Sequence, residues 1–412
     1  MKISAVFLML AAALPLAAAD KLTLDECHKL ARENYPAIKQ FDLIKRAENF
    51  TLENANTKYY PQFSINANAL YLSDYPTIMG QTPVPKDQYH TTLTATQVIW
   101  DGGNIEASKK ITRAQAAIEL QGNEVLMYSL NERVNRLFFG ALLMTEAMRQ
   151  NDILQADIGV AIRQIENRIA GGVANDFDLS LLKVELLKAR QNKTAMESVR
   201  TSFIRMLSKF VGFEISNPDS LEVPKNIDVR AVVINRPELK YYDERSKLFD
   251  AKREAVNAAL MPSIGLFGGA GYGRTNFDMA STDFGFYGLV GIQVSISFGD
   301  YYTEQNEKLK LVAQKKSVEA ERETFLFNTE LDLTEKDEEI LKFDKLIGED
   351  SEILQLRESI KKAALSRMSN GVITSRDYIK ELNAYDLAAQ DSIYHKLQKL
   401  SAQYTRKHIT ND

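Results

Sequence analysis

The chain has 412 residues and a single cysteine, which excludes an intramolecular disulfide framework. Its 51 basic and 55 acidic residues leave a formal net charge of -4, without the basic excess that a nucleic-acid-binding surface requires. The length could hold two or three ordinary domains. The order of its landmarks indicates instead one elongated body made of two similar halves.

Residues 1–19 are predicted to be a signal peptide. Lys2 precedes an apolar run over residues 3–16, and small residues follow at 17–19, so cleavage is expected before Asp20. The apolar run is too short for a transmembrane helix, and no later stretch approaches twenty apolar residues. Cys27 lies too far beyond the cut to be a lipid acceptor and is expected on the first helix. We therefore expect an exported chain without a membrane-spanning helix.

Four landmarks of the first half recur in the second half at a nearly constant shift. The pairs are Pro36 and Pro237, Pro61 and Pro262, Gly172 and Gly371, and Asp178 and Asp377. The proline pairs are 201 positions apart and the later pairs 199. Such agreement indicates an internal duplication. We place the two repeats at 20–216 and 230–412, joined by a linker at 217–229.

Each half begins with a helix and two strands. Thr23 and Glu26 predict a capping box at the first helix, which meets Pro36 and then resumes to about Tyr59. Apolar and polar residues alternate in four later segments, which predicts strands between two unlike environments. The strands are expected at about 62–72, 89–99, 263–274 and 285–298.

Long helices follow the strands in both halves. No proline interrupts the segments at about 104–170 and 302–369, and Leu130, Val134 and Leu137 begin a coiled-coil seam. Glycine turns end both helices. Return helices are then expected at about 176–211 and 375–406.

Four strands cannot close a membrane barrel alone, because the smallest such barrels need about eight strands. Three copies would supply about twelve, whereas two would give a barrel largely filled by side chains. The charged helices would project into the periplasm. The expected fold is thus an α+β membrane protein whose trimer forms a 12-stranded β-barrel, with four strands per chain, continuous with a periplasmic α-helical barrel.

An ordered set of short motifs resembles the TolC family of outer-membrane efflux proteins over about Leu22 to Arg406. The motifs are residues 22–31, Tyr35-Pro36, Tyr60-Pro61, Trp100 to Gly103, and Gly371 with Asp377. The resemblance implies a homotrimer in the outer membrane of a Gram-negative bacterium. It also implies two partners, a periplasmic adaptor (membrane fusion) protein and an inner-membrane pump driven by protons or ATP.

The same resemblance implies that the adaptor docks at the helix-turn tips. The candidate tip residues are Gly171, Gly172, Val173, Ala174, Gly371, Val372 and Ile373. A small residue would let another backbone approach, and an exposed apolar one would anchor it. The alternative is that the glycines only cap their helices.

Asp377 and Asp178 are candidates for a gate at the periplasmic mouth, together with Arg376 and Lys380. Acids repeated by a threefold axis would form rings that favour cations. The alternative is that each acid only stabilises a helix N-terminus.

No catalytic or metal-binding constellation is found, because the four histidines are scattered and one cysteine cannot complete a metal cluster. We therefore expect no enzyme activity, cofactor or metal. The leading hypothesis is a passive exit duct for small molecules such as drugs in a tripartite efflux system. Type I protein secretion and metal efflux remain alternatives within this class. A periplasmic coiled-coil scaffold or adaptor is the alternative from another class.

Overall fold

A computed structural model describes residues 21–74, 77–78, 82–83, 85–227, 233–274 and 283–411. The expected signal peptide and the end of the expected linker lie outside these residues. The chain forms two compact units. The hairpin unit comprises the residues up to Tyr35, Ser129–Ile234 and Asp332–Asp412, and the sheet unit comprises Pro36–Tyr128 and Asn235–Leu331. Each unit takes residues from both repeats, so the compact units do not coincide with the sequence repeats.

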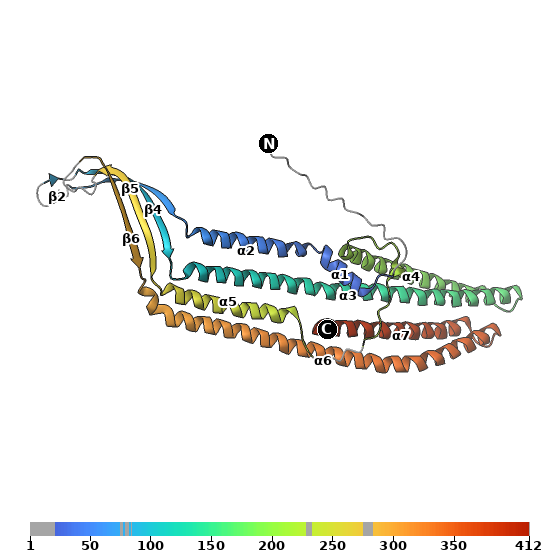
Figure 1. Cartoon of the computed structure of the whole chain (residues 1–412). Helices are drawn as coiled ribbons and strands as arrows, with labels where there is room; N and C mark the ends of the chain where they lie inside the picture. Colours follow the sequence, from blue (N-terminus) through green and yellow to red (C-terminus); the bar gives the residue numbers. More distant parts are fainter. Residues whose placement is uncertain are drawn as a thin grey trace. The chain divides into compact units, whose positions relative to one another are not determined.

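The sheet unit is built around four antiparallel strands in the order β1-β4-β5-β6 (Figure 1). Their bounds are β1 Gln62–Tyr71, β4 Asp87–Trp100, β5 Ser263–Arg274 and β6 Gly285–Ser295. The last strand is shorter than expected, because the chain turns before Gly299, where the following helix begins. Two short strands, β2 (Thr77–Ile78) and β3 (Thr82–Pro83), pair with each other between β1 and β4.

Strand register separates the sheet into two chemically different faces. Side chains of cross-strand partners share a face, and Ile65, Leu93 and Ala270 are successive partners. We call their side the apolar face; its large exposed members include Phe63, Ile65, Leu93, Leu266, Phe286, Val290, Ile292 and Val294. The opposite polar face carries mainly amide, hydroxyl and glycine residues, including Ser64, Asn66, Thr92, Thr94, Gly269 and Gln293.

Helices α2 (Gln40–Thr57) and α5 (Pro237–Ala259) precede the two strand pairs. A 3-10 turn at Pro36–Lys39 separates α2 from α1 (Leu24–Asn34), because a proline interrupts helical hydrogen bonding. The expected capping box of α1 is confirmed: Glu26 N–H donates to Thr23 Oγ1 over 3.3 Å, and Thr23 N–H donates to Glu26 Oε2 over 2.9 Å.

The hairpin unit contains two long helices that each turn back into a return helix (Figure 1). They are the later parts of α3 (Asn104–Ala170) and α6 (Gly299–Ser369), followed by α4 (Asp176–Val211) and α7 (Ser375–Thr410). None of the described helices combines the length and the apolar character needed to cross a membrane.

Both hairpins share one hydrophobic core near their turns. Ile158 and Ile165 of α3 pack with Leu182 of α4, Met368 of α6 and Tyr378 of α7, and all five are almost completely buried. Burying one such side chain is worth about 1.5–3 kcal/mol. This shared core therefore holds the two turns beside each other.

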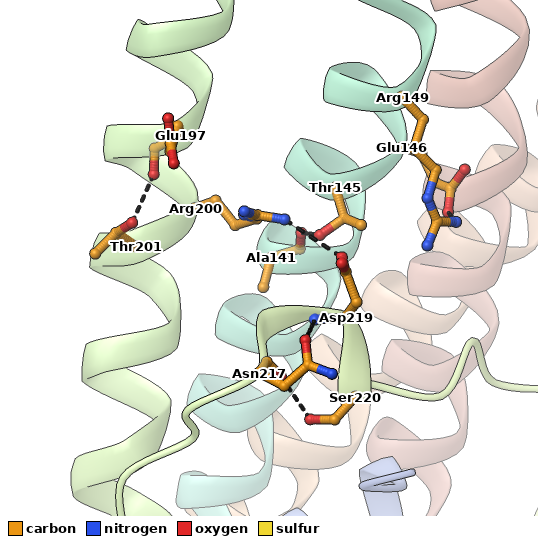
Figure 2. A network of polar contacts seen from close by, with 10 residues as sticks. All are labelled: Ala141, Thr145, Glu146, Arg149, Glu197, Arg200, Thr201, Asn217, Asp219 and Ser220. Atoms are coloured by element: carbon orange, nitrogen blue, oxygen red, sulfur yellow. Dashed lines mark hydrogen bonds and ion pairs between the residues drawn. The ribbon is translucent and has the colours of Figure 1, made fainter. Parts of the chain in front are cut away.

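A second core surrounds α1, where Cys27 is fully buried and its pKa is raised to about 12 by burial. The beginning of the expected linker is held here by polar contacts. Figure 2 shows Arg200 of α4 reaching Asp219, with 3.4 Å between the guanidinium and the carboxylate. Asn217 caps the short turn by accepting a hydrogen bond from Asp219 N–H over 3.0 Å.

Candidate functional site: the paired hairpin turns

The first turn (residues 171–175) ends α3 with two backbone hydrogen bonds. Gly172 N–H donates to Ile169 O over 2.9 Å, and Val173 N–H donates to Arg168 O over 2.9 Å. This is the Schellman arrangement, in which the residue after the helix adopts a left-handed conformation. Gly172 has φ +75°, which glycine adopts without steric cost.

The second turn (residues 370–374) repeats the first nearly atom for atom. Gly371 N–H donates to Met368 O over 3.0 Å, and Val372 N–H donates to Arg367 O over 2.8 Å. Gly371 has φ +73°. The duplication expected from the sequence thus extends here to individual backbone hydrogen bonds.

Each return helix begins at a polar cap. Asn175 Oδ1 accepts from Asp178 N–H over 3.1 Å, and Thr374 Oγ1 accepts from Asp377 N–H over 3.2 Å. At α7 the box is reciprocal, since the Asp377 carboxylate accepts from Thr374 N–H over 3.1 Å and from Thr374 Oγ1–H over 2.7 Å. The candidate gate acids therefore occupy the third position of their helices.

The hydrogen bonds from Thr374 hold the pKa of Asp377 below its usual value, with smaller contributions from the nearby cations Lys380 and Arg376. Asp377 is exposed, and Asp178 is half-buried. The structure thus gives Asp377 a capping role, whereas its role in a gate remains a prediction.

Arg168 joins the two turns, and sequence reasoning missed it. One of its guanidinium nitrogens donates to Met368 O over 2.7 Å, and another donates to Val173 O over 3.2 Å. A Cβ atom at Gly371 would lie 2.7 Å from Arg168 Nη2, so the glycine leaves the space that the guanidinium fills. A basic residue in the last turn of a helix, repeated 199 positions later as Arg367, was the available sequence signal.

The two turns together line one groove of about 560 Å³. Its lining residues are Arg168, Gly172, Val173, Ala174, Asn175, Asp178, Gly371, Val372, Ile373, Thr374, Ser375 and Asp377. Val173 and Val372 are 65% and 70% exposed. The structure thus brings together all the candidate tip residues except Gly171, and both candidate acids. Gly171, Arg376 and Lys380 are exposed nearby but do not line the groove.

Farther from the turns, polar contacts connect the two hairpins. Lys361 of α6 forms an ion pair with Asp157 of α3 over 2.7 Å. Gln150 of α3 donates to the carboxylate of Asp386 of α7 over 3.0 Å, and burial raises the pKa of Asp386. Across the described ranges, no group of three or more His, Cys, Asp or Glu side chains is arranged to hold a metal ion.

Solved structures share this architecture over nearly the whole chain. VceC, an outer membrane protein of Vibrio cholerae, matches with a TM-score of 0.69 at 13% identity, over 94% of this chain and 95% of VceC. The chain has a TolC-like fold. A membrane protein of Pseudomonas aeruginosa matches this TolC-like fold with a TM-score of 0.71 at 15% identity, over 94% and 90% of the two chains. The CmeC outer membrane channel of Campylobacter jejuni matches with a TM-score of 0.64 at 12% identity, over 94% of this chain and 85% of CmeC.

The likeness lies in structure rather than in sequence. No protein-family model matches the chain, and no curated protein matches it at a significant level. The TolC-like fold confirms the expected α+β class, with two repeats of helix, strand pair and long helix and with four strands per chain.

Proposed function

We propose that this chain is one protomer of a trimeric exit duct in the outer membrane of a Gram-negative bacterium. In this proposal the strands of three copies form one barrel in the membrane, and the helices form a periplasmic tunnel. The duct performs no chemistry of its own. It serves a tripartite efflux system that expels small molecules such as drugs.

The two-faced sheet carries this proposal. On the apolar face of β6, Phe286 and Val290 are each 86% exposed, although such side chains are normally buried in a protein core. The polar face of the same strand carries Gln293 and Ser295. In an outer-membrane barrel the apolar face would contact lipid and the polar face would contact water.

Aromatic rings near one end of the apolar face also support membrane insertion. Tyr272 and Phe286 pack with ring centroids 4.6 Å apart, and Tyr89 and Phe284 with centroids 6.3 Å apart. Toward the other end, Trp100 and Phe298 are exposed. Outer-membrane barrels carry such aromatic girdles at both interfaces with water.

The free edges of β1 and β6 require further strands. An open sheet edge inside lipid leaves backbone groups unsatisfied, at several kcal/mol each. Pairing β6 of one copy with β1 of the next would remove both edges. Three copies with four strands each would give about twelve strands, an even number within the known range of such barrels.

Two of the proteins with similar structures agree with this role. VceC is an outer membrane protein and CmeC is an outer membrane channel. By analogy, a periplasmic adaptor protein would dock at the groove between the two turns, and a pump in the inner membrane would supply the energy. Small drug-like molecules are the proposed substrates, and the polar face of the sheet would line the proposed duct.

The test is to purify the full chain in detergent, measure its native mass and insert it into planar lipid bilayers. We expect the mass of three chains and discrete conductance steps. A single chain that stays dissolved without detergent and gives no conductance would contradict the duct and favour the periplasmic scaffold.

A further inference from the structure

Each residue that takes part in the contact of Arg168 with the second turn has an equivalent residue in the other repeat. A shift of 199 positions carries Arg168 to Arg367, and it carries Ile169 and Gly172 to Met368 and Gly371. Arg168 donates to the carbonyl of Met368 and fills the space beside Gly371. The corresponding contact of Arg367 would therefore use the carbonyl of Ile169 and the space beside Gly172.

Within one chain this second contact is not made. Arg367 is exposed, whereas Arg168 is half-buried between the turns. A Cβ atom added at Gly172 would meet nothing within 4 Å, whereas one added at Gly371 would meet the Arg168 guanidinium. The arginine and the place for it are thus both present, but within one chain they do not meet.

We infer that Arg367 of one copy binds the first turn of the neighbouring copy, donating to the carbonyl of Ile169 and lying against Gly172. This inference rests on the proposed trimer. In a closed ring of six hairpins, the first and second hairpins of the three copies alternate. Within one copy the first hairpin contacts the second. Between copies, the second hairpin of one copy therefore contacts the first hairpin of the next. A head-to-tail contact of this kind is what cyclic symmetry repeats around a ring.

The local backbone prepares Arg367 for this contact. Val372 N–H donates to Arg367 O over 2.8 Å, just as Val173 N–H donates to Arg168 O over 2.9 Å, so both arginines leave their helices at equivalent positions. The carbonyl of Ile169 lies in the last turn of α3, where the helix dipole favours a cation. The competing possibility is that Arg367 only stabilises the end of its own helix.

The inference is tested by placing a photo-reactive amino acid at position 367 of the full-length protein and mapping the products by mass spectrometry. We expect a crosslink between two chains, joining position 367 to the peptide that contains Ile169 to Val173. The matched control is position 168, where the structure predicts a crosslink within one chain to the peptide that contains Met368 to Val372.

Native mass of the same samples separates the two ways of failing. If the protein is a trimer and position 168 reacts as expected, but position 367 gives no crosslink to the first turn of another chain, the inference is wrong and the trimer stands. If the protein is a monomer and no crosslink joins two chains, the proposed function is wrong and the inference falls with it.

Discussion

At the tips of the hairpins, single side chains decide how two backbone turns are held. Arg168 contacts Met368, which is 200 residues away in the sequence, and this contact gives Gly371 a purpose beyond its left-handed conformation. Gly172 has the same conformation but an open side. The two glycines, equivalent in sequence, therefore have different surroundings within one chain.

The capping box of α7 should depend on pH. The pKa of Asp377 is lowered by its hydrogen bonds with Thr374, so the ionised carboxylate stabilises the folded turn above the usual carboxyl pKa of about 4. This stabilisation is lost as the pH falls through the lowered pKa of the folded state.

We expect the first turn of α7 to lose protection from amide hydrogen exchange at acidic pH. In Thr374→Ala the protection should be lower at neutral pH and the pH-dependent part should be smaller; an unchanged profile would contradict this role for the pair.

Among the elements, β6 makes the strongest case for two environments, because Phe286 and Val290 are among the most exposed of the large hydrophobic side chains described. Val290 lies at the middle of this strand and Gln293 lies on the opposite face. The two positions therefore offer a matched comparison within one strand.

We expect Val290→Lys to lower the yield of assembled protein in the outer membrane sharply, because a lysine on the lipid face near the bilayer midplane costs about 2–4 kcal/mol. Gln293→Lys should assemble normally, since a charge on the polar face stays in water. The measurement is the amount of trimer in isolated outer membranes. Equal yields of the two variants would mean that the apolar face does not contact lipid.

For the whole molecule, the exposed valines of the groove are the place to look for a partner. In cells that contain the other components, a photo-reactive amino acid at Val372 should capture an adaptor protein, because an apolar side chain that is 70% exposed beside an open groove suits docking. Position 352, an exposed glutamate earlier on α6, serves as the control and should not capture it. If Val372 captures nothing while the protein is abundant in the outer membrane, the glycine turns are only helix caps.

Much of the fold could be predicted from local chemistry. The two-residue period of the strands, the coiled-coil period of the long helices and the glycines of the turns each depend on residues that are close in sequence. The capping box of Thr23 and Glu26 was predicted for the same reason. One detail escaped, because β6 ends earlier than its alternating pattern suggests.

The sequence by itself thus determined the elements, their order and the duplication, because hydrogen-bond geometry and hydrophobic periodicity are local properties. Only the tertiary structure decided which elements meet. It paired β4 with β5 across the two repeats, gathered both turns around one groove and placed Arg168 between them. These contacts join residues far apart in the sequence. They depend on how whole helices and strands pack, and such packing produces no periodic pattern that can be read from neighbouring residues.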